Sequence, residues 1–113
     1  MTELADFRAR LRHKDHPFAA TLAFIAEHYH YQPSAFTNGP LSNAAGQNEV
    51  SCKVLGLALL EHFSLDEALL AFGEHYRQVL GDPAGSDHGN IRALLAHGLV
   101  GVTLAQQPLT PKA

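Results

Sequence analysis

The sequence predicts an all-α fold: a compact orthogonal or irregular bundle of about five helices with one long polar loop. Apolar residues recur at intervals of three and four along most of the chain, which is the period of an amphipathic helix. The run Ser64-Leu65-Asp66-Glu67 matches the capping-box motif that opens a helix. Residues 1–113 have the length of one domain, so we expect a single helical domain.

Two apolar stripes predict the amino-terminal helices. The first helix is short and carries Leu4, Phe7 and Leu11 on one side. Asp15 and Pro17 are typical of a helix start, and they predict that a second helix begins there. The apolar residues of this second helix follow at spacings of four, three and four: Phe18, Leu22, Ile25 and Tyr29.

A third helix is predicted from Asn48 to Phe63. Its run VLGLALL is apolar almost all round, as expected of a helix buried at the centre of a bundle. We therefore expect the second, fourth and fifth helices to pack on it, with Leu57 and Leu59 almost fully buried.

The capping box predicts a fourth helix that begins after Ser64 and ends at Gly81. Its interior contains Gly73, and a glycine at such a position indicates close approach of another backbone. The apolar stripe of this helix is Leu65, Leu69, Phe72, Tyr76 and Leu80.

The carboxy-terminal part of the chain predicts one more helix and an extended end. Ser86 or Asp87 can cap a fifth helix, which Gly98 should end. Apolar residues then alternate from Val100 to Leu104, but a lone strand has no pairing partner. We therefore expect an extended segment docked on the bundle there, and a frayed tail over residues 106–113.

Composition excludes several classes of function. The formal net charge of −3 lacks the basic footprint of a nucleic-acid-binding protein, and no apolar run is long enough to span a membrane. One cysteine cannot form an internal disulfide, and the start MTELADFRARLRH lacks the apolar core of a signal peptide. We therefore expect a cytoplasmic protein that binds neither nucleic acid nor membrane.

The segment from Tyr29 to Lys53 is the main candidate for a site. Long loops inside a compact domain usually carry function or are disordered, and this one contains aromatic residues that a disordered segment would avoid. Its polar side chains supply both hydrogen-bond donors and acceptors, for a ligand or for a network that fixes the loop. The candidate ligand-binding residues here are Asn38, Asn43, Gln47, Asn48, Glu49, Ser51 and Lys53.

The start of the third helix has the features of an anion site. If Asn48 is the cap, the free N–H groups of the first turn and the helix dipole favour a carboxylate or phosphate, with Ser51 and Lys53 close by. The alternative is that Glu49 already neutralises this helix end and pairs with Lys53 four residues on.

A second group of candidates lies in the turn from Asp87 to Arg92. Asp87 can cap the fifth helix, with Asn90 as its reciprocal partner. His88 and Arg92 are four residues apart, so both can reach one ligand or one carboxylate such as Glu49. The alternative is a structural network that satisfies buried polar groups of the long loop.

Cysteine chemistry and metal binding are the remaining possibilities. A helix start lowers a thiol pKa, so Cys52 can be a nucleophile with His88 as its base; the alternative is a small buried residue beside Leu55. The eight histidines form no HExxH motif, and His28 and His30 lie on different faces of a helix. We expect no metal and no cofactor, and catalytic residues remain unassigned.

Several runs of residues resemble the HopJ type III effector family. They cover roughly residues 18–104, with departures at Val50, where glycine is common in the family, and at Leu99, where an aromatic residue is common. The resemblance implies no established reaction. The runs are Tyr29-His30-Tyr31, Ala35-Phe36-Thr37-Asn38-Gly39, Asn43-Ala44-Ala45-Gly46-Gln47-Asn48-Glu49, Ser51-Cys52-Lys53, Phe72-Gly73-Glu74, Tyr76-Arg77 and Gly85-Ser86-Asp87-His88-Gly89-Asn90-Ile91-Arg92.

These observations favour a non-enzymatic module that binds a small polar or anionic ligand, or a protein partner, at a polar site. One alternative is a secreted type III effector that acts in host cells, as the family name implies; the charged helix predicted near the start argues against the flexible leader of such proteins. The other alternative is a hydrolase or transferase that uses Cys52 and His88.

Overall fold

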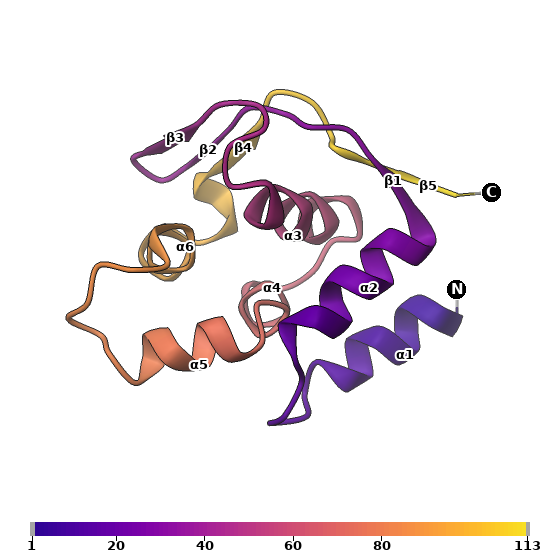
Figure 1. Cartoon of the computed structure of the whole chain (residues 1–113), viewed down its shortest axis with the longest axis horizontal. Helices are drawn as coiled ribbons and strands as arrows, with labels where there is room; N and C mark the ends of the chain where they lie inside the picture. The colour runs from indigo at the N-terminus through magenta and orange to yellow at the C-terminus, as the bar shows by residue number, and fades with distance from the viewer. Residues whose placement is uncertain (1, 113) are drawn as a thin grey trace.

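Helices and short strands together build this protein, whose computed structural model describes residues 2–112. Helix α3 lies in the middle, with α1 and α2 on one side, α5 and α6 on the other, and the strands along one edge (Figure 1). The helices are α1 (Thr2–Arg10), α2 (Phe18–His28), α3 (Glu49–Leu60), α4 (Leu65–Leu70), α5 (Glu74–Leu80) and α6 (Gly89–His97), with a 3-10 turn, η1 (Leu99–Gly101). The strands are β1 (Tyr29–Tyr31), β2 (Phe36–Asn38), β3 (Leu41–Asn43), β4 (Val102–Leu104) and β5 (Leu109–Pro111).

The all-α prediction is wrong, because the described residues contain two small antiparallel sheets beside the six helices. Strand β2 lies between β3 and β4 in one sheet, and β1 pairs with β5 in the other. Each strand has three residues, which is too short for an alternating pattern to predict a strand on its own. Their partners also lie far apart in the sequence, as in the pairing of Phe36 with Leu104.

The chain after α6 pairs with the polar segment at two places, β1 and β2. The segment from Val102 to Leu104, expected to lie alone, finds its partner in β2. Part of the expected frayed tail, residues 109–111, is a strand instead, and residue 113 lies outside the described residues. Tyr31 is opposite Leu109, and the N–H of Lys112 donates to the carbonyl of His28 at 2.9 Å. Tyr29 leaves the predicted second helix because its backbone is already extended, although its side chain is buried as expected.

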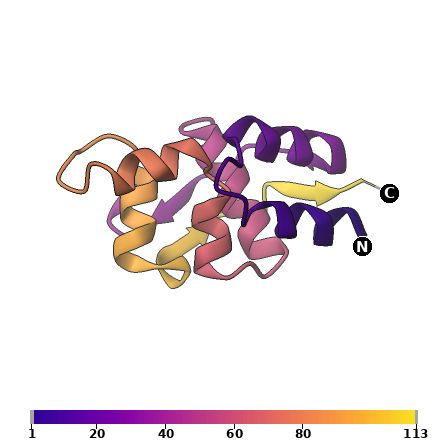
Figure 2. The same ribbon diagram turned by 90° about the horizontal axis from the view of Figure 1, so that it is seen from below.

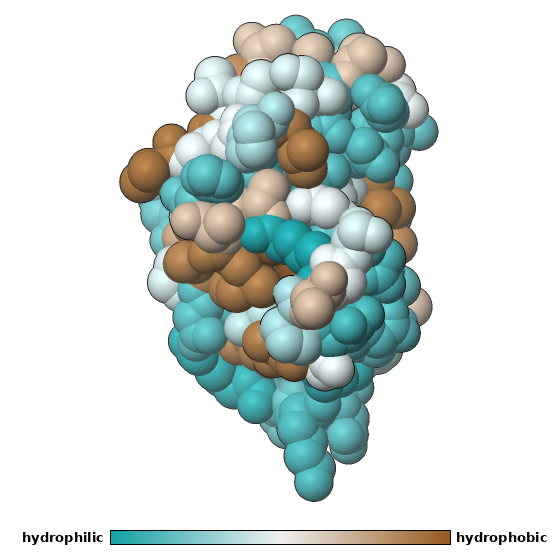
Figure 3. Space-filling view, turned by 90° about the vertical axis from the view of Figure 1, so that its left-hand side faces the viewer, coloured by the Kyte–Doolittle hydropathy of each residue, from teal (hydrophilic) through white to brown (hydrophobic). Residues whose placement is uncertain are grey.

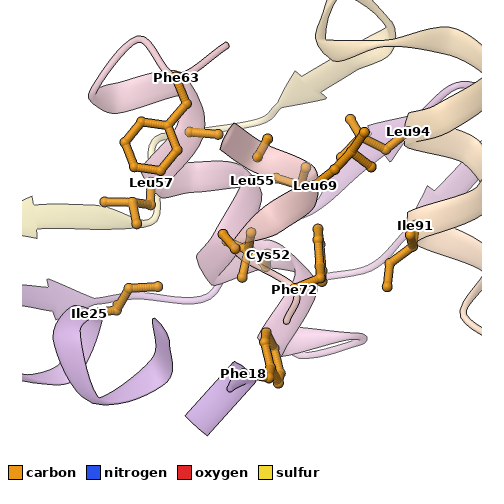
Figure 4. Packing of buried hydrophobic residues seen from close by; sticks show 14 of the residues in the cluster. Phe18, Ile25, Cys52, Leu55, Leu57, Phe63, Leu69, Phe72, Ile91 and Leu94 are labelled. Carbon is orange, nitrogen blue, oxygen red and sulfur yellow. The ribbon is translucent and has the colours of Figure 1, made fainter. Parts of the chain in front are cut away.

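The buried face of α3 forms the centre of the core. Leu57 is fully buried, which confirms the prediction, but Leu59 is only partly buried. Figure 4 shows Cys52, Leu55 and Leu57 of α3 amid side chains from other elements of the core. The chain just before β5 covers another part of α3 so closely that a Cβ on Gly56 would lie 2.5 Å from Pro108.

The predicted fourth helix is broken into α4 and α5. The capping box at Ser64 is present in full, since its hydroxyl accepts from the Glu67 N–H and the Glu67 carboxylate accepts from the Ser64 N–H. The break occurs at Gly73, whose φ of +59° favours glycine. The expected close approach is confirmed, because a Cβ there would lie 2.5 Å from the backbone nitrogen of Phe18.

Helix α6 ends at Gly98 as predicted, but it begins after His88, beyond Ser86 and Asp87. It packs against α4, α5 and strand β2. Helices α5 and α6 lie at one end of the molecule, and the chain termini lie at the other (Figure 2). Among residues 2–112, the helices are too short or too polar to cross a membrane.

Candidate functional site

The amino ends of α3 and α6 open into one cleft of about 390 Å³. This volume is in the range of small-molecule sites. Residues from five different parts of the chain line the cleft, and aromatic, aliphatic, amide and imidazole groups are all present: Phe18, Asn48, Val50, Ser51, Phe72, His75, His88, Gly89, Asn90 and Ile91.

Both helices begin in the same unusual way. Asn48 (φ 52°, ψ 49°) and His88 (φ 53°, ψ 49°) adopt the left-handed conformation, and neither side chain caps its helix. The first N–H groups of a helix have no partner within the helix, and its dipole places partial positive charge at this end. Two such ends at one cleft provide backbone donors and a favourable field for an anion.

Two imidazoles lie together in the cleft wall. The rings of His75 and His88 are 4.9 Å apart, and His75 also meets Phe18 edge-on at 5.0 Å. The Nε2 of His88 lies 2.9 Å from Oε1 of Gln78, an acceptor, so this nitrogen carries a proton. The Nδ1 of His75 is buried and has no hydrogen-bond partner among the described residues.

A chain of four asparagines supports the cleft from behind. Asn38 is fully buried, and its Nδ2 donates to the carbonyl (2.8 Å) and the side-chain oxygen (3.0 Å) of Asn90. Asn43 Oδ1 accepts from Asn90 at 3.3 Å and from Asn48 at 2.6 Å. This network joins the β2–β3 hairpin to the starts of both helices, so it fixes the two walls of the cleft relative to each other.

The candidate residues from the sequence therefore separate into three groups. Four line the cleft: Asn48, Ser51, His88 and Asn90. Asn38 and Asn43 lie behind them in the asparagine network. The remaining five are engaged elsewhere: Gln47, Glu49, Lys53, Asp87 and Arg92.

Glu49 and Lys53 meet at Tyr31, and none of these three residues lines the cleft. The Tyr31 hydroxyl donates to Glu49 at 3.0 Å, and the Lys53 ammonium lies 4.8 Å from the centre of the Tyr31 ring. Burial and the Glu49 carboxylate raise the pKa of Tyr31. The expected Glu49–Lys53 ion pair is not among those of residues 2–112, and Gln47 accepts from the Ala44 N–H within the loop.

Arg92 holds the loop between α5 and α6. It donates to the Asp87 carbonyl at 2.6 Å, to the Asp87 carboxylate at 2.7 Å and to the Asp82 carbonyl at 2.8 Å. The hydrogen bond from Arg92 lowers the pKa of Asp87. Arg92 and His88 thus lie at one carboxylate, that of Asp87, whose Oδ2 is 3.8 Å from the Nε2 of His88. Asp87 binds Arg92 in place of capping α6.

The surface beside Arg92 is apolar. Figure 3 views this end of the molecule, where hydrophobic side chains gather around a strongly hydrophilic one. A shallow groove here is lined by Arg92 and apolar residues: Val79, Leu80, Pro83, Leu95 and Ala96. All hydrogen bonds described for Arg92 lie within its own loop, so this groove has less polar chemistry than the cleft.

Cys52 does not have the environment of a nucleophile. Its side chain is 2% exposed, its thiol donates weakly to the carbonyl of Ser34 at 3.6 Å, and burial raises the thiol pKa. His88 lines the cleft, whereas Cys52 does not. The described residues also include no group of three or more His, Cys, Asp or Glu side chains arranged to hold a metal ion.

Sequence reasoning missed the aromatic and imidazole wall of the cleft. The sequence assigned His75 no place in a binding site, and it predicted Phe18 and Phe72 only as members of apolar helix stripes. These residues come from α2, the α4–α5 turn and α5, so no local motif joins them to Asn48 or His88. The one available signal was Gly73, which brings the start of α2 against the start of α5.

Comparison with known proteins agrees with the resemblance found in the sequence. The family described as HopJ type III effector protein matches residues 4–109. A crystal structure of an unknown function protein VPA0580 is 34% identical and superposes with a TM-score of 0.90, covering 99% of this chain and 93% of that one. None of the curated proteins compared with the chain matches it. The resemblance is thereby confirmed, and the neighbour adds the fold but no activity.

Proposed function

The chain belongs to the HopJ type III effector protein family, and from this premise we propose that it is a binding module for a small anionic ligand. The observation that carries the proposal is the convergence of two uncapped helix starts and two imidazoles on one cleft. The ligand's negative charge would meet first-turn N–H groups of α3 and α6.

The buried asparagines support binding over catalysis. They hold both helix starts in place before a ligand arrives, so little ordering is needed on binding. The cleft wall contains no nucleophilic side chain apart from the Ser51 hydroxyl, and the carboxylate beside its His88, that of Asp87, is already bound by Arg92. The thiol of Cys52 is buried, and this position argues against a hydrolase or transferase that uses it.

The family description favours a second element of the proposal, delivery into a host cell. A binding module would act there by sequestering or sensing its ligand, and the same cleft would serve in the producing cell. A reporter fused to the full chain and expressed in a secreting bacterium tests delivery. Signal inside host cells supports it, and signal confined to the bacterium contradicts it.

The binding proposal is tested by blocking the cleft. Val50 lines the cleft and is 44% exposed, so Val50→Trp should fill the cleft without disturbing the core. Leu80→Trp is the matched control, since Leu80 is 56% exposed on α5 and lies outside the cleft. Thermal unfolding is measured for all three proteins with a panel of small carboxylates and phosphates.

We expect at least one anion to raise the melting temperature of the wild type and of Leu80→Trp but not of Val50→Trp. The mechanism is mass action, because a ligand that binds only the folded state stabilises it. Equal stabilisation of Val50→Trp would place binding elsewhere and contradict the proposal. Absence of stabilisation by every anion in the panel would also count against it.

A further inference from the structure

The cleft also restricts the kind of anion. We infer that its ligand is a singly charged carboxylate attached to a small apolar or aromatic body. This inference rests on the proposed function and narrows it. Three features of the cleft carry the inference: the charges in and around it, the number of hydrogen-bond donors, and the apolar part of its wall.

The cleft wall has no fixed charge. None of the residues that line it is Lys, Arg, Asp or Glu. Sites for phosphate commonly contain Arg or Lys, whose full charge compensates a dianion. Here the attraction comes from helix ends equivalent to about half a charge each, together with the imidazole rings. Such a field matches one negative charge better than two.

Carboxylates next to the cleft strengthen this preference. Glu49, Glu74 and Asp87 each stand beside a lining residue in the chain. Two of them touch lining residues: Glu74 Oε1 accepts from the Phe18 N–H at 2.8 Å, and Asp87 Oδ2 lies 3.8 Å from the Nε2 of His88. Coulomb repulsion is proportional to the ligand's charge, so these groups oppose a dianion about twice as strongly as a monoanion.

The donors suit the two oxygens of a carboxylate. The first-turn N–H groups of Val50 and Ser51 belong to α3, and those of Gly89 and Asn90 belong to α6. The ring of His75, whose Nδ1 is buried without a partner among the described residues, can supply a further donor in the tautomer that carries its proton on Nε2. A carboxylate accepts about four hydrogen bonds, so these donors can satisfy it without a cation.

The rest of the wall is apolar. Phe18 and Phe72 stack with ring centres 6.0 Å apart and planes 13° from parallel. Figure 4 shows Phe72 above Phe18, with Ile91 to the side. The exposed methyl groups of Val50 complete this part of the cleft. An aromatic ring or short aliphatic chain would lose water on entering it, at about 25 cal/mol per Å².

The experiment compares three probes that share a phenyl ring: benzoate, phenyl phosphate and benzamide. They carry one charge, about two charges and none at pH 7.5. Each probe is titrated into ¹⁵N-labelled full-length protein while amide chemical shifts are recorded. We expect benzoate to shift the amides of Ser51 and Asn90 saturably, with at least tenfold higher affinity than the other two. Val50→Trp should abolish these shifts, and Leu80→Trp should keep them.

The outcomes separate the inference from the proposed function. Tighter binding of phenyl phosphate at the same amides would overturn the preference for one charge, and the anion site would stand. Equal binding of benzamide would show that charge is not recognised, which also overturns the inference. If no probe shifts these amides, both the inference and the anion-binding cleft fail.

Discussion

At the scale of single residues, Asn43 connects strand β2 with the starts of helices α3 and α6. Its side-chain oxygen accepts from two other asparagines, and its amide nitrogen lies 3.4 Å from the carbonyl of Phe36. The sequence suggested either a ligand site or a structural network in this loop. The structure contains both a network and a cleft. Asn38 and Asn43 belong to the network alone, while Asn48 and Asn90 belong to the network and also line the cleft.

Asn43→Ala should destabilise the fold by about 1–3 kcal/mol, because the buried amide of Asn90 loses its acceptor. In a domain of this size, that loss lowers the melting temperature by several degrees. Gln47→Ala is the control, since Gln47 is exposed and makes only a hydrogen bond within the loop. Urea unfolding of both variants measures the difference, and equal losses would mean that the network is not a structural support.

His16 makes the fold sensitive to acid. It is buried, and its Nε2 lies 2.7 Å from the hydroxyl of Thr21, which itself donates to the Ala71 carbonyl. Burial, then the charges of Arg10 and Arg77, lower the pKa of His16 below its usual value of 6.5, while Glu74 opposes this shift. The unfolded chain therefore binds more protons than the native state once the pH falls below 6.5.

The predicted consequence is a loss of stability as the pH falls from 6.5 towards 5. His16→Gln has no titrating ring at this position, so its melting temperature should fall less steeply over the same interval. Melting curves of both proteins between pH 8 and pH 5 measure the two slopes. Parallel slopes would show that protonation of His16 is not coupled to unfolding.

At the scale of elements, the sequence predicted features that depend on neighbours in the chain. The capping box at Ser64 and the helix end at Gly98 are local, and both are confirmed. The predicted start of α6 at Ser86 or Asp87 was wrong because His88 adopts the left-handed conformation, and no sequence motif predicts that conformation. The strands and the wall of the cleft escaped prediction because their partners lie in distant parts of the sequence, as for Asn38 and Asn90.

The junction of α4 and α5 provides a direct test of close packing. Gly73→Ala should destabilise the fold by at least about 3 kcal/mol, because it combines an unfavourable φ of +59° with a Cβ 2.5 Å from the Phe18 nitrogen. Gly46→Ala is the matched control: its φ is +85°, but nothing lies within 4 Å of the added Cβ. It should cost only about 1–2 kcal/mol. Similar losses in chemical denaturation would mean that the junction can relax.

At the scale of the whole molecule, the carboxy-terminal strand closes the core. Strand β5 pairs with β1, which follows α2, and it also contacts α3; the residue before it, Pro108, lies against Gly56 of that helix. Gln107 reinforces this contact by donating to the Gly56 carbonyl at 3.1 Å. The segment around β5, which the sequence suggested to be frayed, thus joins helices α2 and α3. The preceding strand, β4, pairs with β2 in the hairpin that supports the cleft.

This arrangement predicts that the end of the chain contributes fully to stability. Leu109 is 2% exposed, so Leu109→Ala should leave a cavity beside α3 and cost about 2–5 kcal/mol of unfolding free energy. Leu80→Ala removes the same atoms from a side chain that is 56% exposed, and it should change stability by no more than about 0.5 kcal/mol. Urea unfolding with two spectroscopic probes measures both variants and checks that the transition stays cooperative. If Leu109→Ala costs no more than Leu80→Ala, the tail is frayed in solution, and the pairing of β1 with β5 does not hold the core together.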